Sequence, residues 1–171
     1  LVLDRSRSEV SMIRSVLLAA VVASASLTSP AFGQGSGPVV DLRSPAAAEA
    51  ANVIDVFHAA LARADVAAAL AVLADDVLIF EAGHVERSKS EYASHHAPAD
   101  AAYASAVPSK LQKRTAVADA DVAWVTSESR ATGRYKDKAV DQLATETMML
   151  RKTVDGWRII HIHWSSRPAP K

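Results

Sequence analysis

Apolar residues at helical spacing begin the folded part of the chain and predict two helices. The first set recurs every three or four positions, which places it on one helix face: Val53, Phe57, Ala60, Leu61 and Ala64. Ser44 is suited to cap this helix and Pro45 to its first turn, so we expect it to cover about 45–63. Asp65 should cap a second, shorter helix that ends at Asp75-Asp76.

The pattern then changes to the β-branched and aromatic runs that are typical of strands. A first strand should begin at Val77, and a third helix at Ser88, which forms a capping box with Glu91. Pro98 interrupts that helix. Four long strands separated by turn residues should follow, over 110–117, 123–134, 142–154 and 157–165. Helices first and antiparallel strands last predict an α+β fold with the helices on one face of the sheet.

The segment before the first helix has the three-part pattern of a secretory signal peptide. Arg14 precedes an uncharged apolar run over 15–27, and small residues lead up to Gln34. The run is shorter than the ~20 apolar residues that a membrane-spanning helix needs. We therefore expect a periplasmic or secreted protein without a membrane anchor after cleavage.

This pattern divides the chain into four parts. Residues 1–33 should form an upstream extension and the signal peptide, 34–44 a flexible linker, 45–167 the folded domain, and 168–171 a tail. A length of 171 residues fits one such domain. Nineteen basic and nineteen acidic residues give no net charge to attract nucleic acid, and the absence of cysteine excludes disulfides and thiolate metal sites.

Several segments resemble the nuclear transport factor 2-like superfamily, and in particular its SnoaL-like branch, which includes the calcium/calmodulin-dependent kinase association domain. The resemblance covers about 47–166 and is strongest at Phe57–Leu61, Phe80–His84, Glu91-Tyr92 and Trp157–Ser165. It implies a cone-shaped fold in which a bent antiparallel sheet wraps on N-terminal helices around a pocket for a small ligand. It also implies a homodimer through the outer face of the sheet. Because this fold hosts enzymes, assembly domains and plain binders, catalysis stays an open question.

Histidines carry the main chemical signal. Strict alternation along the last strand would place Trp157, Ile159, His161, His163 and Ser165 on one face. The resemblance implies that this face borders the pocket, together with the end of the first strand and the third helix. The predicted ligand pocket therefore consists of Glu81, Tyr92, His161, His163 and Ser165.

An alternative interpretation uses the histidines as metal ligands. Neutral imidazole binds copper and zinc well, so the candidate set is His84, His95, His96, His161 and His163. No cofactor is required by the pattern. A third interpretation is a dimeric assembly domain without catalysis.

The remaining polar candidates are interpreted as surface residues. We expect His58 to be partly exposed, and Glu128, Arg130 and Glu146 to form cross-strand ion pairs. The sequence assigns no catalytic residue, because the Asp/His and Asp/Tyr pairs of enzymatic members of the superfamily have no clear counterpart.

Overall fold

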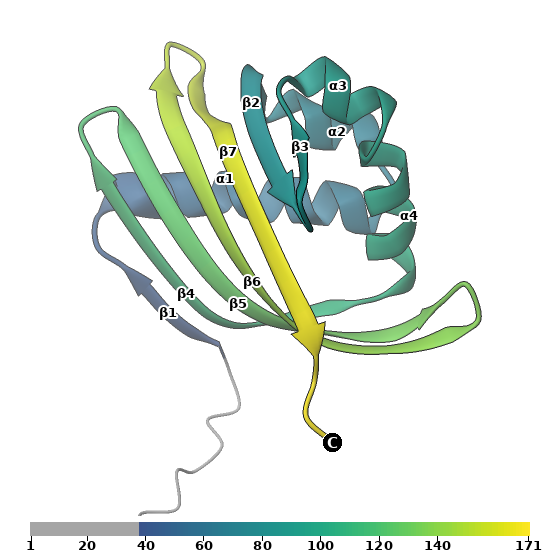
Figure 1. Ribbon diagram of the computed structural model, residues 1–171. Coiled ribbons are helices and arrows are strands. Elements are labelled where there is room, and N and C mark those ends of the chain that lie inside the picture. Colours follow the sequence, from purple (N-terminus) through teal and green to yellow (C-terminus); the bar gives the residue numbers. More distant parts are fainter. Residues whose placement is uncertain (1–37) are drawn as a thin grey trace, which may run out of the picture. The chain divides into compact units, whose positions relative to one another are not determined.

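The computed structural model describes residues 38–171 as one bent sheet with four helices against one of its faces (Figure 1). The predicted upstream extension and signal peptide lie outside the described residues. The helices are α1 (Pro45–Ala62), α2 (Val66–Ala71), α3 (Lys89–Ser94) and α4 (Ala97–Ala106). The strands are β1 (Val39–Leu42), β2 (Leu73–Glu81), β3 (His84–Glu86), β4 (Ser109–Asp119), β5 (Val122–Tyr135), β6 (Lys138–Thr153) and β7 (Gly156–Pro168). No helix among these residues is long and apolar enough to cross a membrane.

The predicted helix caps are confirmed. The Ser44 hydroxyl accepts a hydrogen bond from the Ala47 amide at 3.1 Å, and Asp65 caps α2 in the same way. Ser88 accepts from the Glu91 amide at the start of α3. Capping of this kind satisfies amide groups that the first helical turn leaves unpaired. Four of the seven buried residues of α1 are alanines, whose small side chains let this helix lie close to the sheet.

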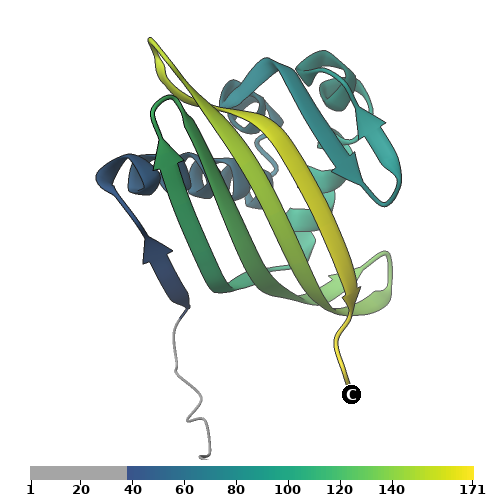
Figure 2. The ribbon, with the colours of Figure 1, turned by 60° about the vertical axis from the view of Figure 1, so that its left-hand side comes forward.

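The sheet is mixed, with strand order β1-β4-β5-β6-β7-β2-β3. Strands β4 to β7 form the predicted antiparallel meander, whereas β1 pairs parallel to β4 and β2 parallel to β7. Figure 2 shows α1 lying across the back of this meander. The apolar core fills the space between α1 and the sheet.

Several elements differ from the prediction, among them β6, which begins at Lys138 rather than at residue 142, and β3, which was not expected. Strand β2 begins at Leu73, four residues early, because Leu73 and Ala74 bury their side chains and the Ile159 amide donates to the Val72 carbonyl at 3.0 Å. Strand β1 falls within the predicted linker. Its backbone groups gain partners on the open edge of β4, which outweighs its weak apolar pattern.

A bulge in β7 overturns the predicted face of its histidines. Leu150 pairs with Ile159 and Met149 with His161, so Ile160 is an extra residue without an opposite partner. A bulge of this kind reverses the alternation beyond it. Trp157 and Ile159 face the core, as do Ile162 and Trp164, and His161 and His163 therefore point to the opposite face.

Candidate functional site

One row of residues crosses five strands on the face that packs against α1, and we call it the polar row. The register pairs each member with the next, in the order Arg114, Ser127, Glu146, Trp164 and Glu81. The neighbouring row on the same face is apolar and buried: Ala116, Val125, Met148, Ile162 and Ile79. The polar row therefore borders the apolar core and places hydrogen-bonding side chains directly beside it.

The row on its other side is built from small side chains. Ser129, Ala144 and Ser166 occupy this row on β5, β6 and β7. Small residues beside a polar row leave its carboxylates and indole less covered than large residues would. This pattern favours access of a small ligand to the polar row from the side of these small residues.

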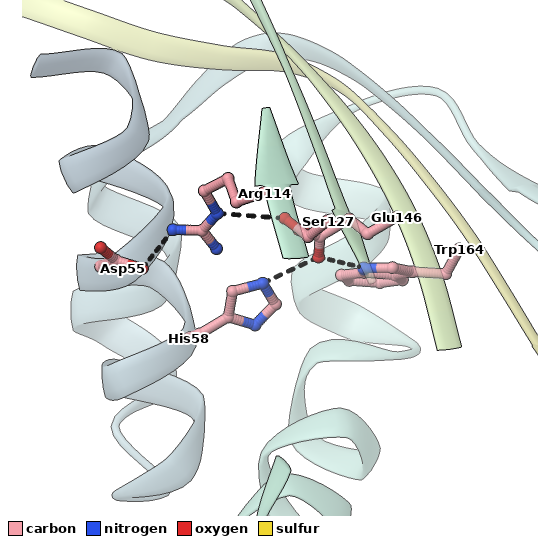
Figure 3. A network of polar contacts seen from close by, with 6 residues as sticks. All are labelled: Asp55, His58, Arg114, Ser127, Glu146 and Trp164. Atoms are coloured by element: carbon pink, nitrogen blue, oxygen red, sulfur yellow. Dashed lines mark hydrogen bonds and ion pairs between the residues drawn. The ribbon is translucent and has the colours of Figure 1, made fainter. Parts of the chain in front are cut away.

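Glu146 is the centre of the first network, which Figure 3 shows. Its side chain is only 8% exposed, and its Oε2 accepts hydrogen bonds from His58 Nε2 and from Trp164 Nε1, each at 2.8 Å. His58 comes from α1, and its side chain is 43% exposed, so the imidazole joins the buried carboxylate to solvent. The Trp164 indole stacks on Phe57 of α1, with 6.2 Å between ring centroids.

Arg114 forms a second contact between α1 and the sheet. The guanidinium is nearly buried; it donates to Asp55 Oδ1 at 2.5 Å and to the Ser127 hydroxyl at 3.2 Å. Asp55 and His58 lie one turn apart on α1 and thus hold the helix to β4 and β6 at adjacent points. The network contains two cationic and two anionic groups and has no net charge when His58 is protonated.

The charges in this network stabilise one another. Burial lowers the pKa of His58, but the Glu146 carboxylate outweighs it and the pKa is raised overall. Burial raises the pKa of Glu146, yet His58, the Trp164 hydrogen bond and Arg114 leave it lowered overall. Each group thus favours the charged form of the other, an imidazolium beside a carboxylate.

One oxygen of this carboxylate has no partner. Among the described residues, Glu146 Oε1 is buried and receives no hydrogen bond. An unsatisfied charged oxygen costs folding free energy, and such groups are found where a protein recognises a ligand or holds a water molecule. Glu146 Oε1 thus offers an acceptor to a ligand that brings a hydroxyl, an N–H or an acidic proton.

Glu81 occupies the opposite end of the polar row, next to Trp164. Burial and the nearby Asp100 raise its pKa. Asp100 itself accepts a hydrogen bond from the buried Tyr92 hydroxyl at 2.9 Å, and burial raises the pKa of Asp100 as well. Tyr103 of α4 donates to Gln142 of β6 at 3.3 Å, and burial followed by Glu81 raises its pKa. These acidic and phenolic groups form a second cluster, with Glu81 half-buried at its edge.

A family model described as a SnoaL-like domain matches residues 50–170. The chain belongs to the SnoaL-like family. A solved structure from Shewanella frigidimarina, described as a "putative ketosteroid isomerase", is 41% identical, covers 74% of this chain and 99% of its own, and has a TM-score of 0.68. No curated protein matches the chain.

More distant structures confirm the nuclear transport factor 2-like fold. A protein of unknown function from Pseudomonas putida is 23% identical, covers 73% of this chain and 87% of its own, and has a TM-score of 0.60. The CaMKII hub of S. rosetta is 20% identical, covers 72% of this chain and 98% of its own, and has a TM-score of 0.59.

The residues that we predicted for the ligand pocket lie on two faces of this SnoaL-like domain. Glu81 and Tyr92 are on the helix side. His161 and His163 are on the outer face, where both rings stand edge-on to Phe80. Ser165 also lies on the outer face, in a shallow hollow that is lined in part by Glu128, Thr145 and Arg167.

The five candidate metal ligands do not come together. Within residues 38–171 no group of three or more histidines and carboxylates has the arrangement of a metal site. His96 is hydrogen-bonded to the buried Glu86, and its ring meets that of His84 edge-on at 5.8 Å. His95 is the C-cap residue of α3, and His161 and His163 lie on the outer face.

Sequence reasoning missed His58 and Glu146 as a pair. The expectation of cross-strand ion pairs is confirmed for Arg130, which bonds Asp141 at 2.7 Å, and for Glu128, 3.7 Å from Lys113. It is wrong for Glu146, which faces the core. The sequence did contain a signal that Glu146 faces inward. Alternation along the strand puts it on the same face as Met148 and Leu150, both of which are buried.

Proposed function

We propose that this SnoaL-like domain binds a small organic ligand over the polar row and transfers a proton on it. The observation that carries the proposal is the pair of carboxyl groups on either side of Trp164. Glu146 has a lowered pKa and Glu81 a raised one. Two carboxyl groups whose surroundings move their pKa values apart are suited to different roles in acid–base chemistry.

The spacing of the row limits the ligand. Neighbouring strands are about 4.8 Å apart, so the backbones of Glu81 and Glu146, two strands apart, are separated by about 10 Å. A ligand of one or two rings spans that distance and covers the Trp164 indole between them. Its polar end would donate a hydrogen bond to Glu146 Oε1, and its reacting carbon would lie at Glu81.

Glu81 is the general base in this proposal. Its raised pKa brings the carboxylate closer to working pH, where a base accepts a carbon-bound proton more readily. The carboxylate takes a proton from the carbon next to a carbonyl group and returns it to another carbon of the same molecule. One C–H bond breaks and another forms, the carbon–carbon double bond moves into conjugation with the carbonyl group through a dienolate, and no oxidant or reductant is consumed. The name given to the Shewanella relative, an isomerase, agrees with this reaction class.

A simple ketone tests the proton transfer at Glu81 by itself, because it carries no hydrogen-bond donor for Glu146 Oε1. We expect the purified chain to convert cyclohex-3-en-1-one into the conjugated cyclohex-2-en-1-one, seen by ultraviolet absorbance, with deuterium exchange in heavy water. The rate should rise with pH as Glu81 loses its proton, with a midpoint above the ordinary glutamate pKa of 4.5. The exposed Glu128→Gln variant is the matched control and should keep the full rate. A wild-type protein that neither exchanges nor isomerises the ketone at any pH would count against proton-transfer chemistry.

We further propose that two copies associate through the outer face of the sheet. Half of the ten exposed large apolar side chains in the described residues gather there: Leu78, Phe80, Val122, Trp124 and Met149. The face spans about 24 Å over five strands and about 20 Å along four rows of residues. This outline of about 480 Å² is more than half of the ~800 Å² that each partner contributes to a standard interface. A monomer rarely leaves such a surface uncovered.

Export is also a proposal, supported by Arg14 and the apolar run over 15–27. We expect mass spectrometry of the protein from its native host to find a mature chain that begins close to Gln34. A secreted or periplasmic fraction devoid of the protein, or a chain that retains residues 15–27, would overturn it.

A further inference from the structure

Two histidines occupy the middle of the apolar outer face. The register places His161 between Met149 and Leu78, and His163 between Thr147 and Phe80. Both rings contact the edge or face of Phe80, with centroid separations of 5.1 and 6.3 Å. Trp124, in the same row as Met149 and His161, is 42% exposed. Any partner that covers Phe80 and Trp124 therefore also covers the two imidazoles.

In the described chain, the outer-face carboxylates of the neighbouring strands that come nearest in the register are already paired. From β2 and β6, Asp76 and Arg151 form an ion pair at 2.9 Å. From β4 and β5, Lys113 and Glu128 are 3.7 Å apart. Arg158 lies opposite Arg151 on β7 itself. The direct row neighbours of both imidazoles in the described chain are uncharged, so nothing beside them compensates a positive charge once water is removed.

Neutral and charged imidazole differ sharply in the free energy that it costs to bury them in such an interface. A neutral ring packs against aromatic and aliphatic side chains at little cost, whereas a buried imidazolium without a partner is strongly disfavoured. Burial already lowers the pKa of His161 in the single chain, assisted by its neighbour His163. In a two-fold interface each histidine occurs twice, so protonation would introduce as many as four positive charges.

We infer that the outer face is a proton-sensitive interface, which holds a second copy of this chain while His161 and His163 are neutral and releases it when they are protonated. The inference rests on the proposed dimer. Since the separated chains bind more protons than the dimer, acid favours the separated form by linkage. The dimer dissociation constant should rise at least tenfold between about pH 7.5 and about pH 5.5, the range in which histidine titrates.

Sedimentation equilibrium of the full chain with EDTA at constant ionic strength tests this. We expect the wild type to be dimeric at about pH 7.5 and largely monomeric at about pH 5.5 at micromolar concentration. The His161→Asn/His163→Asn variant should stay dimeric at both pH values. His95→Asn, which removes an exposed histidine away from this face, should dissociate in acid as the wild type does.

The outcomes of this experiment test the dimer and the proton switch separately. A wild type that is monomeric at both pH values overturns the dimer and the proton switch together. A wild type that is dimeric at both overturns the switch alone, as does acid dissociation that persists in the asparagine variant. The imidazole C–H resonances of the wild type, titrated at low and high protein concentration, give the same answer if the variant does not fold. The switch requires their midpoints to move to lower pH on association.

Discussion

Replacement of Glu81 by glutamine should lower the proton-transfer rate on cyclohex-3-en-1-one by about 10²–10⁴-fold. Glutamine has nearly the same shape but cannot accept a proton from carbon, so the loss should fall on kcat with little change in KM. The ultraviolet assay measures both constants. The residual rate should no longer rise with pH, because the group that titrates is gone. A Glu81→Gln variant with the wild-type rate and pH profile would assign the base to another residue.

The same variant should gain stability, which distinguishes a functional carboxylate from a structural one. The raised pKa of Glu81 means that the folded state holds its proton more tightly than the unfolded chain. Its contribution is therefore most favourable below the unfolded pKa and is lost as pH rises through the folded pKa. Glutamine avoids this loss, so we expect a gain of about 0.5–2 kcal/mol at pH above that midpoint and less in acid. Urea unfolding at several pH values measures the difference.

The helical part of the fold was predictable because its signals are local. Ser44 and Ser88 act through amides three residues away, and the periodicity of α1 extends over most of its length. Strands β1 and β2 were harder, since their first residues are fixed by pairing with β4 and β7, far along the sequence. Such long-range pairing gives little signal in the local sequence of either strand.

The site was predicted only in part, for two physical reasons. The bulge at Ile160 moved His161 and His163 to the outer face, and an apolar residue in an apolar run gives no sequence signal for a bulge. The pairing of His58 with Glu146 depends on how α1 crosses the sheet, which periodicity does not give. Glu81 and Tyr92 lie on the helix side, and their place in a ligand pocket stays a prediction.

Replacement of His58 by leucine should destabilise the fold more than its partial exposure suggests. The change leaves the Glu146 carboxylate buried with only Trp164 as a hydrogen-bond donor. Breaking a buried ion pair from one side costs about 3–5 kcal/mol, and we expect about 2–4 kcal/mol here because solvent reaches the imidazole. Thermal and urea unfolding near neutral pH measure the loss. The matched control His95→Leu should change stability by no more than about 0.5 kcal/mol.

The pH dependence identifies the cause of that loss. Glu146 has a lowered folded pKa, so its contribution in the wild type exists above the unfolded value of 4.5 and is lost as pH falls through the folded pKa. His58 has a raised folded pKa, so its contribution exists below the unfolded value of 6.5 and is lost as pH rises through the folded pKa. The gap between wild type and His58→Leu should thus be widest between these two folded pKa values.

A second substitution tests whether the unpaired charge is responsible. In the His58→Leu/Glu146→Gln variant the amide oxygen still accepts from Trp164, but no buried charge remains without a partner. We expect this variant to be about 1–2 kcal/mol more stable than His58→Leu alone near neutral pH, and similar to it in acid, where Glu146 is protonated. If the double variant were instead the less stable of the two, lost packing around His58 rather than the orphaned carboxylate would explain the effect. The polar row would then be held by α1 through contact area, and Glu146 Oε1 would be left as a ligand acceptor that the fold tolerates at little cost.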